Sequence, residues 1–316
     1  MKRRDFLGAC AAPLFAGSAW AAPDSVGKIV VGATPGGGTD LVARALASEL
    51  RARLQRQFVV DNRPGAGGNI AAAAVAKAEA DMGTLLVCYT SHAINASLFA
   101  KLPFDPVKDF TPLSLLSRSP LLLVARPELP ANNLRELLAL IRSKPGKHSI
   151  GVAGVGSANH LAGEMLKKQA NLDLTSVPYK GTGPALADAM GGQIDLVLSN
   201  VGSAQELVKG GKLKVLAVST AKRVPAYPDA APIADVLPDF DYGSWYGLLG
   251  PAGLKPAAAE RATAAARAAV AGEEMRRHLV AEGMEPVGSD AATFAAFLRQ
   301  EIERWGKVVA LTGAKV

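Results

Sequence analysis

A glycine-rich loop near the start of the chain holds the residues best suited to chemistry. Gly36, Gly37 and Gly38 follow Pro35 and precede a segment, 40–54, with the residue spacing of a helix. Glycines let a backbone approach a ligand closely, and the first N–H groups of a helix have no acceptor within that helix. The helix dipole favours negative charge at the same place. The loop is therefore predicted to bind an anion.

A second glycine loop repeats the first at an offset of 120 residues. The stretch HSIGVAGVGSANHLAGEMLKK, at 148–168, reads as a strand, a glycine loop and a helix. On this alignment Asp40 falls on His160, and Leu46 falls on Leu166. Two such units predict two similar domains, each offering a helix N-terminus. A small anion between them can be held from both sides, and clefts between domains are preferred ligand sites.

The glycine patterns do not match the motifs of nucleotide-binding proteins. A dinucleotide fingerprint needs G-x-G-x-x-G, but Leu41 and Asn159 stand where the third glycine is required. A P-loop ends in Gly-Lys-Ser/Thr, whereas Gly38 is followed by Thr39 and Asp40. These mismatches disfavour a nucleotide phosphate as the bound anion.

Patterns for catalysis and metal binding are weak. The G-x-S-x-G string of a nucleophilic serine does not occur. Ser157 and His160 are three residues apart at a helix start, where a serine commonly caps the helix. An exported, hydrolase-like α/β enzyme using this pair is kept as an alternative. The four histidines are far apart in sequence, so we predict no catalytic residues, no metal site and no cofactor.

Residues 1–21 resemble a secretory signal peptide. A basic start and a short apolar stretch lead to an Ala-x-Ala motif at 19–21, which predicts cleavage near Ala21 and Ala22. The arginine pair at the start, followed by Asp-Phe-Leu, indicates the twin-arginine route, with the general secretory route as the alternative. We therefore expect a periplasmic protein.

The composition is that of a globular chain with a basic excess. Hydrophobic residues make up 49% and charged residues 20% of the 316 residues. The net charge is +7, and removal of 1–21, with three basic residues and one acidic residue, leaves +5. This charge can attract an anion over a distance. We expect no nucleic-acid partner, because the basic residues are scattered and the chain is exported.

Strand-like and helix-like segments alternate along the chain. Short apolar runs at 84–89 and 120–126 predict strands buried on both faces. The alternation predicts an α/β fold in which mostly parallel sheets are flanked by helices. The segment 242–253 is expected to return the chain to the first domain. Helices are predicted after it at 256–272, 273–283 and 291–308.

Several stretches in order resemble the Bug family, the TctC-like extracytoplasmic receptors of tripartite tricarboxylate transporters. RPGAGGN at 63–69 and PYKGTGPALADAMGGQID at 178–195 are the more specific ones. Others are PGGGTD at 35–40, HAINASLFAKLPFDPVKDFTPL at 92–113, GSANHLAGEML at 156–166, SWYGLLGPAG at 244–253 and FLRQEIERWGKVV at 297–309.

This resemblance implies a monomeric, two-domain periplasmic binding protein that closes on a small carboxylate without catalysis. It also implies delivery of the ligand to membrane subunits of a tripartite tricarboxylate transporter. Residues 22–120 plus 246–316 are expected to form domain 1, and 121–245 domain 2. In the family, the first loop and a helix start in the second domain hold one carboxylate, partly through water. Here these are Thr34, Gly36, Gly37, Gly38, Thr39, Asp40, Ser157, Ala158 and Asn159.

Further ligand contacts are predicted near strand ends, each with a structural alternative. Ser199 and Asn200 end a strand, which is where ligands bind in α/β folds. Trp245 either packs on the ligand or fills the hinge region. His92 either touches the ligand or is a hydrogen-bonded loop histidine. The full set is Ser91, His92, Tyr179, Gly181, Ser199, Asn200 and Trp245.

A second alternative keeps the same fold and gives it a signalling role. A ligand sensor that feeds a kinase has the same two domains and the same carboxylate site. The sequence does not distinguish this role from transport, and it does not name the carboxylate.

Overall fold

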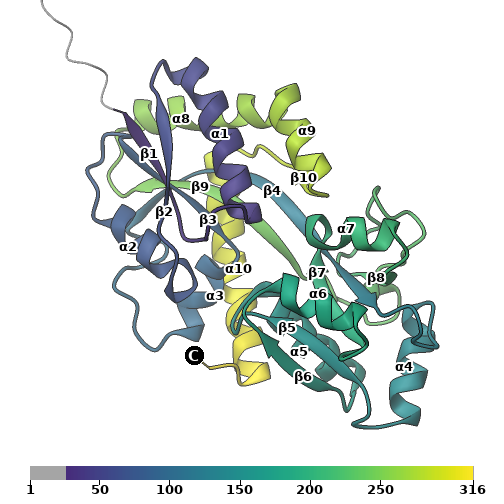
Figure 1. Cartoon of the computed structure of the whole chain (residues 1–316). Helices are drawn as coiled ribbons and strands as arrows, with labels where there is room; N and C mark the ends of the chain where they lie inside the picture. Colours follow the sequence, from purple (N-terminus) through teal and green to yellow (C-terminus); the bar gives the residue numbers. More distant parts are fainter. Residues whose placement is uncertain (1–25, 316) are drawn as a thin grey trace, which may run out of the picture.

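The computed structural model describes residues 26–315 and divides into two groups of strands and helices, here called lobe 1 and lobe 2 (Figure 1). The predicted signal peptide, with its cleavage near Ala21 and Ala22, lies outside the described residues. Lobe 1 begins with β1 (Gly27–Val31), α1 (Gly38–Leu54), β2 (Phe58–Asn62), α2 (Asn69–Ala76), β3 (Thr84–Tyr89) and α3 (Ser91–Leu98).

A long strand, β4 (Phe110–Ala125), carries the chain from lobe 1 into lobe 2. The elements of lobe 2 are α4 (Leu134–Ser143), β5 (Ser149–Ala153), α5 (Ala158–Ala170), β6 (Thr175–Tyr179), α6 (Thr182–Met190), β7 (Leu196–Asn200), α7 (Val201–Lys209) and β8 (Lys214–Val218). The chain returns through β9 (Gly243–Pro251), α8 (Pro256–Ala271), α9 (Glu273–Ala281), β10 (Glu285–Pro286) and α10 (Ala291–Thr312).

The strands form one continuous ladder in the order β2-β1-β3-β9-β4-β7-β5-β6, with β8 and β10 also paired to β4. Pairing is parallel within each lobe, between β1 and its neighbours β2 and β3, and between β5 and its neighbours β6 and β7. The strands that cross between the lobes pair antiparallel with their neighbours. The predicted α/β class is confirmed, and the sheet is mixed because β4 and β9 run in opposite directions.

The partner of β4 changes in the middle of the strand. Pro120 pairs with Gly243 of β9, and the next residue, Leu121, pairs with Asn200 of β7. The sequence predicted only the second half, 120–126, because Pro112 and the serines of the first half break the apolar run. The register shifts after Pro112 and again after Leu115, so these residues sit at irregularities that a crossing strand tolerates.

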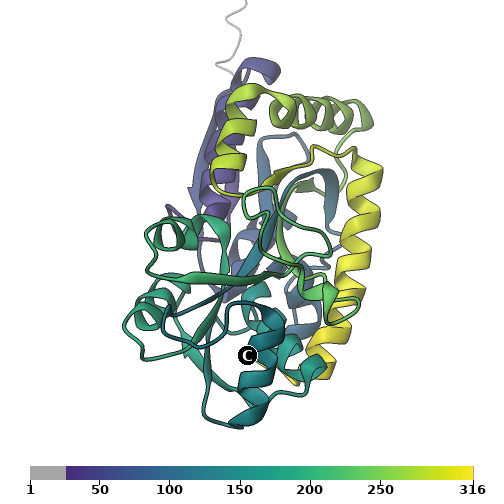
Figure 2. The same cartoon turned by 90° about the vertical axis from the view of Figure 1, so that its right-hand side faces the viewer.

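Helix α10 joins the two lobes along one side of the molecule. It runs past both lobes in the two views, and it contacts α3 of lobe 1 and α5 of lobe 2 (Figures 1 and 2). Its N-cap is Asp290, whose side chain accepts the backbone N–H of Thr293. Phe294, Trp305 and Val308 on its buried face join a core that continues into both lobes.

Candidate ligand-binding site

The first glycine loop leads directly into the N-terminus of α1. Gly36 has a left-handed backbone, with φ of +83°, and Gly37 is the N-cap residue. Residues 34–37 are exposed. Within residues 26–315 the backbone N–H groups of Gly37, Gly38 and Thr39 have no hydrogen-bond acceptor. Three N–H groups at one helix start are thus available to an anion.

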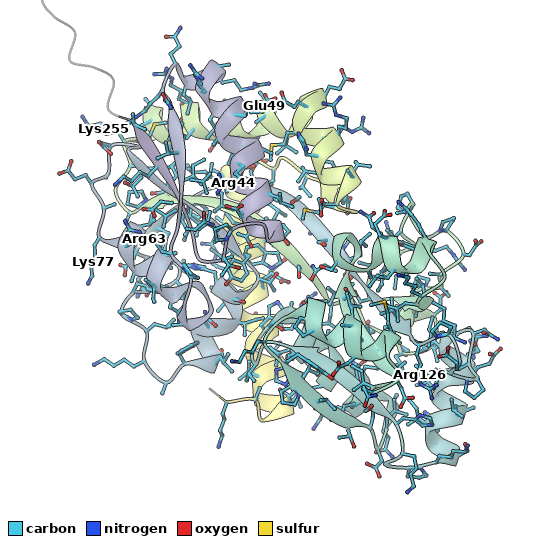
Figure 3. The ribbon with its side chains drawn as sticks, viewed as in Figure 1. Arg44, Glu49, Arg63, Lys77, Arg126 and Lys255 are labelled. Atoms are coloured by element: carbon cyan, nitrogen blue, oxygen red, sulfur yellow. The ribbon has the colours of Figure 1, made fainter. Side chains whose placement is uncertain are left out.

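Asp40 holds this loop in place. Its carboxylate accepts the backbone N–H of Gly36 at 2.9 Å, so donation from this N–H group to a ligand stays a prediction that the contact does not favour. The same carboxylate also accepts Arg44 at 2.8 Å and Asn62 at 2.9 Å (Arg44 is labelled on α1 in Figure 3). Burial alone would raise the pKa of Asp40, but these hydrogen bonds hold it below its ordinary value.

The second loop repeats this geometry in lobe 2. Gly156 has φ of +77°, and Ser157 is the N-cap of α5. The backbone N–H of Gly156 is accepted by Nδ1 of His160 at 3.0 Å, just as Gly36 donates to Asp40 four residues later. The predicted repeat at an offset of 120 residues is therefore confirmed down to the hydrogen bond.

The contacts of His160 do not favour a catalytic pair. Its Nδ1 is occupied by Gly156, while its backbone N–H is accepted by Ser157 Oγ at 3.2 Å as a helix cap. Burial is the largest cause that lowers the pKa of His160. In the described part of the chain, the N–H groups of Ala158 and Asn159 find no acceptor. The second loop therefore offers two N–H groups to a ligand, in addition to the three that the first loop offers.

The first three residues of β9 with side chains connect the two loops. Tyr246 lies under Gly38, and the backbone N–H of Trp245 is accepted by Thr90 Oγ1 at 2.8 Å. Ser244 is within 3.4 Å of the Asn200 amide. Asn200 in turn accepts the amide of Asn159 at 3.2 Å. A continuous chain of contacts therefore runs from the start of α1 to the start of α5.

A second set of contacts joins the lobes beside α7. The Gln205 amide donates to the carbonyl of Ala281 at 3.1 Å. Glu282 lies against Gly202, in the first turn of α7, and Gly283 packs on Val201. A carboxylate next to a helix N-terminus is favourably placed relative to the helix dipole. The end of α9 thus packs on the start of α7.

Four of the predicted contact residues have their polar groups engaged within the protein. His92 Nε2 donates to the carbonyl of Pro106 at 3.0 Å, and its ring packs on Phe104 and Phe110. Burial lowers the pKa of His92 to about 4, because the charged form would lose its hydration. These contacts match the hydrogen-bonded alternative for His92, although the residue lies in α3 and not in a loop.

The Trp245 indole is buried and donates to Glu301 of α10 at 2.7 Å. The Tyr179 hydroxyl donates to Asp188 at 2.7 Å, and burial followed by the Asp188 charge raises the pKa of Tyr179 to about 12. The hydroxyl of Ser199 is fully buried and donates to the carbonyl of Asn200. Ligand contact by these side chains stays a prediction that the arrangement does not favour.

The remaining predicted residues lie near the loops. Ser91 is the first residue of α3, directly after β3 and Thr90, and it interacts with Tyr89. Gly181 is the N-cap of α6, and Thr34 precedes the first loop. Asn200 lies between the lobes, where its amide faces Ser119 and Ser244 at 3.4 Å. Their contact with a ligand also stays a prediction.

Sequence reasoning missed Tyr246, Ser119 and Ser244. Successive side chains of a strand point to opposite faces, so Trp245 and Tyr246 cannot both face the loops. Trp245, the residue that the sequence predicts as a contact, is the one that packs against α10. The strand alternation in SWYG was the signal that could have found Tyr246.

Two further properties concern residues 26–315. They contain no group of three or more histidine, cysteine or acidic side chains arranged to hold a metal ion. None of their helices combines the length and apolar character that crossing a membrane requires.

The architecture is that of a periplasmic solute-binding protein. The periplasmic binding protein BugD has a TM-score of 0.81 and 31% identity, with 93% of this chain and 99% of BugD covered. A protein of R. palustris solved with adipate has a TM-score of 0.83 and 33% identity, with 92% of this chain and 98% of that protein covered. MatC from Rhodopseudomonas palustris, solved with bound malate, has a TM-score of 0.78 and 33% identity, with 90% of this chain and 98% of MatC covered.

Residues 42–313 match the family model described as "Tripartite tricarboxylate transporter family receptor". The chain belongs to this family of solute-binding receptors. Among its relatives, Protein BugT of Bordetella pertussis is 32% identical over 292 residues, which are 92% of this chain and 90% of BugT. Family and structural neighbours are solute-binding proteins and not enzymes, so the hydrolase-like and signalling alternatives receive no support.

Proposed function

We propose that this receptor binds a small carboxylate between its two glycine loops and delivers it to the membrane subunits of a tripartite tricarboxylate-type transporter. The observation that carries the proposal is the pair of equivalent helix starts, where three N–H groups on α1 and two on α5 have no acceptor among residues 26–315. The structural neighbours solved with adipate and malate support the same ligand class, since both molecules are carboxylates.

The number of N–H groups fits the binding of a small ligand. A hydrogen bond to a charged oxygen contributes about 1.5–3 kcal/mol. Five such donors can offset the cost of immobilising the ligand and leave an affinity of about a micromolar. Backbone N–H groups can therefore bind the carboxylate without an arginine. The side chains around the loops would select ligands by their shape.

We propose that the lobes are the two expected domains, 22–120 plus 246–316 and 121–245. The change of partner of β4 between Pro120 and Leu121 supports this division. A ligand held by both helix starts stabilises the closed arrangement only through contacts to both lobes. The expected motion is therefore a hinge at the crossings of β4 and β9.

We propose a periplasmic location for the receptor. Members of the family are periplasmic binding proteins, and the predicted signal peptide at 1–21 supplies an export route. We propose a monomeric receptor, because a site built from two lobes of one chain needs no second copy.

A thermal-shift screen tests the proposal. The purified protein is melted with adipate, malate and other small carboxylates, and with the neutral amide of each as a matched control. Ligand binding to the native state raises the melting temperature with the logarithm of ligand concentration over Kd. We expect at least one carboxylate to raise it and its amide to leave it unchanged. Equal shifts for acid and amide, or no shift and no co-purified carboxylate by mass spectrometry, contradict the proposal.

A further inference from the structure

The hydroxyl of Tyr246 is an unexplained polar group at the first glycine loop. Tyr246 is 6% exposed, and its ring packs among the residues that join α1 to the sheet. A Cβ built on Gly38 would lie 2.7 Å from the hydroxyl oxygen, which shows that this oxygen points at the first residue of α1. No hydrogen-bond partner for the hydroxyl is found among residues 26–315.

Neighbouring aromatic side chains do have partners. The hydroxyl of Tyr89, which faces Tyr246 across the β3–β9 pair, donates to the carbonyl of Gly32. The indoles of Trp245 and Trp305 both donate to Glu301. The Tyr246 ring is buried, but its oxygen is not among the fully enclosed, unpaired side-chain atoms of residues 26–315. The oxygen is therefore accessible at the loop, and its hydrogen-bond partner can come from outside the chain.

The surroundings decide what kind of partner fits. Burial first, and then the charge of Glu282 and the neighbouring Tyr89, raise the pKa of Tyr246, so the hydroxyl keeps its proton and acts as a donor. It lies beside the positive end of α1, where three N–H groups have no acceptor in the described part of the chain. A donor hydroxyl among donor N–H groups suits an acceptor-only ligand group such as a carboxylate.

We propose that the Tyr246 hydroxyl donates a hydrogen bond to the ligand carboxylate bound at the N-terminus of α1. The inference rests on the proposed function and adds to it a side-chain contact from the crossing strand β9. Because β9 also reaches Asn200 through Ser244, the carboxylate then touches the strand that links both loops.

The first test removes the hydroxyl and keeps the ring. Tyr246→Phe and wild type are titrated by calorimetry with adipate and malate. We expect the Kd of the variant for whichever of the two binds wild type to rise about tenfold or more, because the lost bond is to a charged group. The melting temperature without ligand should stay within a few degrees of wild type. Tyr242→Phe is the matched control, since its ring lies against Phe240 and Trp305 rather than at either loop.

The outcomes separate this inference from the function on which it rests. If wild type binds no carboxylate of the screen, the proposed function fails. If wild type binds and Tyr246→Phe binds equally well, only the role of Tyr246 is overturned. A crystal structure of wild type with the bound acid decides independently of any variant: we expect the hydroxyl within hydrogen-bond distance of a carboxylate oxygen, and a separation with no bond overturns the inference.

Gly38→Ala gives a second, orthogonal test. The new Cβ would push the Tyr246 hydroxyl aside, because the two would otherwise be 2.7 Å apart. We expect this substitution to weaken binding more in wild type than in the Tyr246→Phe background, where the oxygen is absent. Equal fold-changes in the two backgrounds would show that the hydroxyl does not take part.

Discussion

At the residue scale, Gly37 offers a clean test of the first loop. Its φ of −80° and ψ of 164° are open to any amino acid, and a Cβ there meets only the Thr34 carbonyl, at 3.6 Å. We expect Gly37→Val to leave the melting temperature nearly unchanged. Its side chain would occupy the space beside the free N–H groups and raise the Kd for the carboxylate about a hundredfold, equivalent to the loss of about two charged hydrogen bonds. Calorimetry and thermal melting measure both quantities.

Gly36→Val is the matched control for that variant. Gly36 has φ of +83°, which a β-branched residue cannot adopt without strain, although a Cβ there meets no atom within 4 Å. We expect this change to lower the free energy of unfolding by roughly 1–3 kcal/mol. A Gly37→Val protein that binds as tightly as wild type would contradict the assignment of the loop.

His92 predicts a dependence of stability on pH. Its pKa of about 4 in the folded protein lies below the ordinary 6.5 of the unfolded chain, so the unfolded chain takes up the proton first as pH falls. The stability due to neutral His92 is complete above pH 6.5 and is lost towards pH 4. Between pH 7 and 5 this contributes a loss of roughly 2 kcal/mol in the free energy of unfolding.

Urea unfolding of wild type and His92→Gln at both pH values measures this effect. Glutamine keeps a donor for the Pro106 carbonyl but does not titrate, so the variant should lose less stability on acidification than wild type. The same loss in both proteins would rule out His92 as the source.

At single residues, part of the candidate site could be predicted from the sequence and part could not. The loops, their helix starts and the Asp40–His160 correspondence follow from short-range patterns, and the structure contains them. The sequence did not reveal that Gly36 donates to Asp40, because this depends on the rotamer of one side chain. The sequence also did not show which of Trp245 and Tyr246 faces the loops, because adjacent side chains of a strand point to opposite faces of the sheet.

At the element scale, local patterns predicted most of the long helices and several inner strands, but not α3, α4 and α7 and not the crossings. β1, β3 and β7 are apolar runs, whereas the first half of β4 contains Pro112 and Arg118 and reads as a loop. That half is a strand only because β9 returns more than a hundred residues later to pair with it. Long-range pairing of this kind leaves little trace in the local sequence.

Glu301 anchors α10 to the crossing strand β9 and gives a prediction for these elements. One oxygen of its buried carboxylate accepts both the Trp245 and the Trp305 indole, and Arg304 pairs with the other at 3.3 Å. Glu301→Ala leaves two buried N–H groups unpaired, so we expect the free energy of unfolding to fall by roughly 3 kcal/mol.

Glu301→Gln is the conservative comparison. Its amide oxygen can still accept both indoles, and we expect a loss of roughly 1 kcal/mol. Urea unfolding followed by tryptophan fluorescence measures both variants. Two equal losses would show that the shared indole acceptor does not hold α10 to β9.

At the scale of the whole molecule, net charge governs the approach of the ligand. Without 1–21 the chain carries a charge of +5, which attracts an anion over a distance that salt shortens. We expect the association rate constant for adipate or malate to fall about two- to threefold between 10 and 300 mM salt, with little change in dissociation. Stopped-flow fluorescence measures both rates, and an association rate independent of salt would exclude steering.

The central claim is that a carboxylate bridges the two lobes, and the distance between them tests it most directly. Lys77→Cys on lobe 1 and Lys144→Cys on lobe 2 provide exposed sites for a fluorophore pair, while the native Cys88 is buried (Lys77 is labelled in Figure 3). Energy transfer is recorded with the carboxylate that calorimetry shows to bind, and with its amide. If a carboxylate bridges the lobes, energy transfer changes on saturation with the acid and does not change with the amide. Saturated binding without any change in energy transfer would contradict a carboxylate bridge between the lobes.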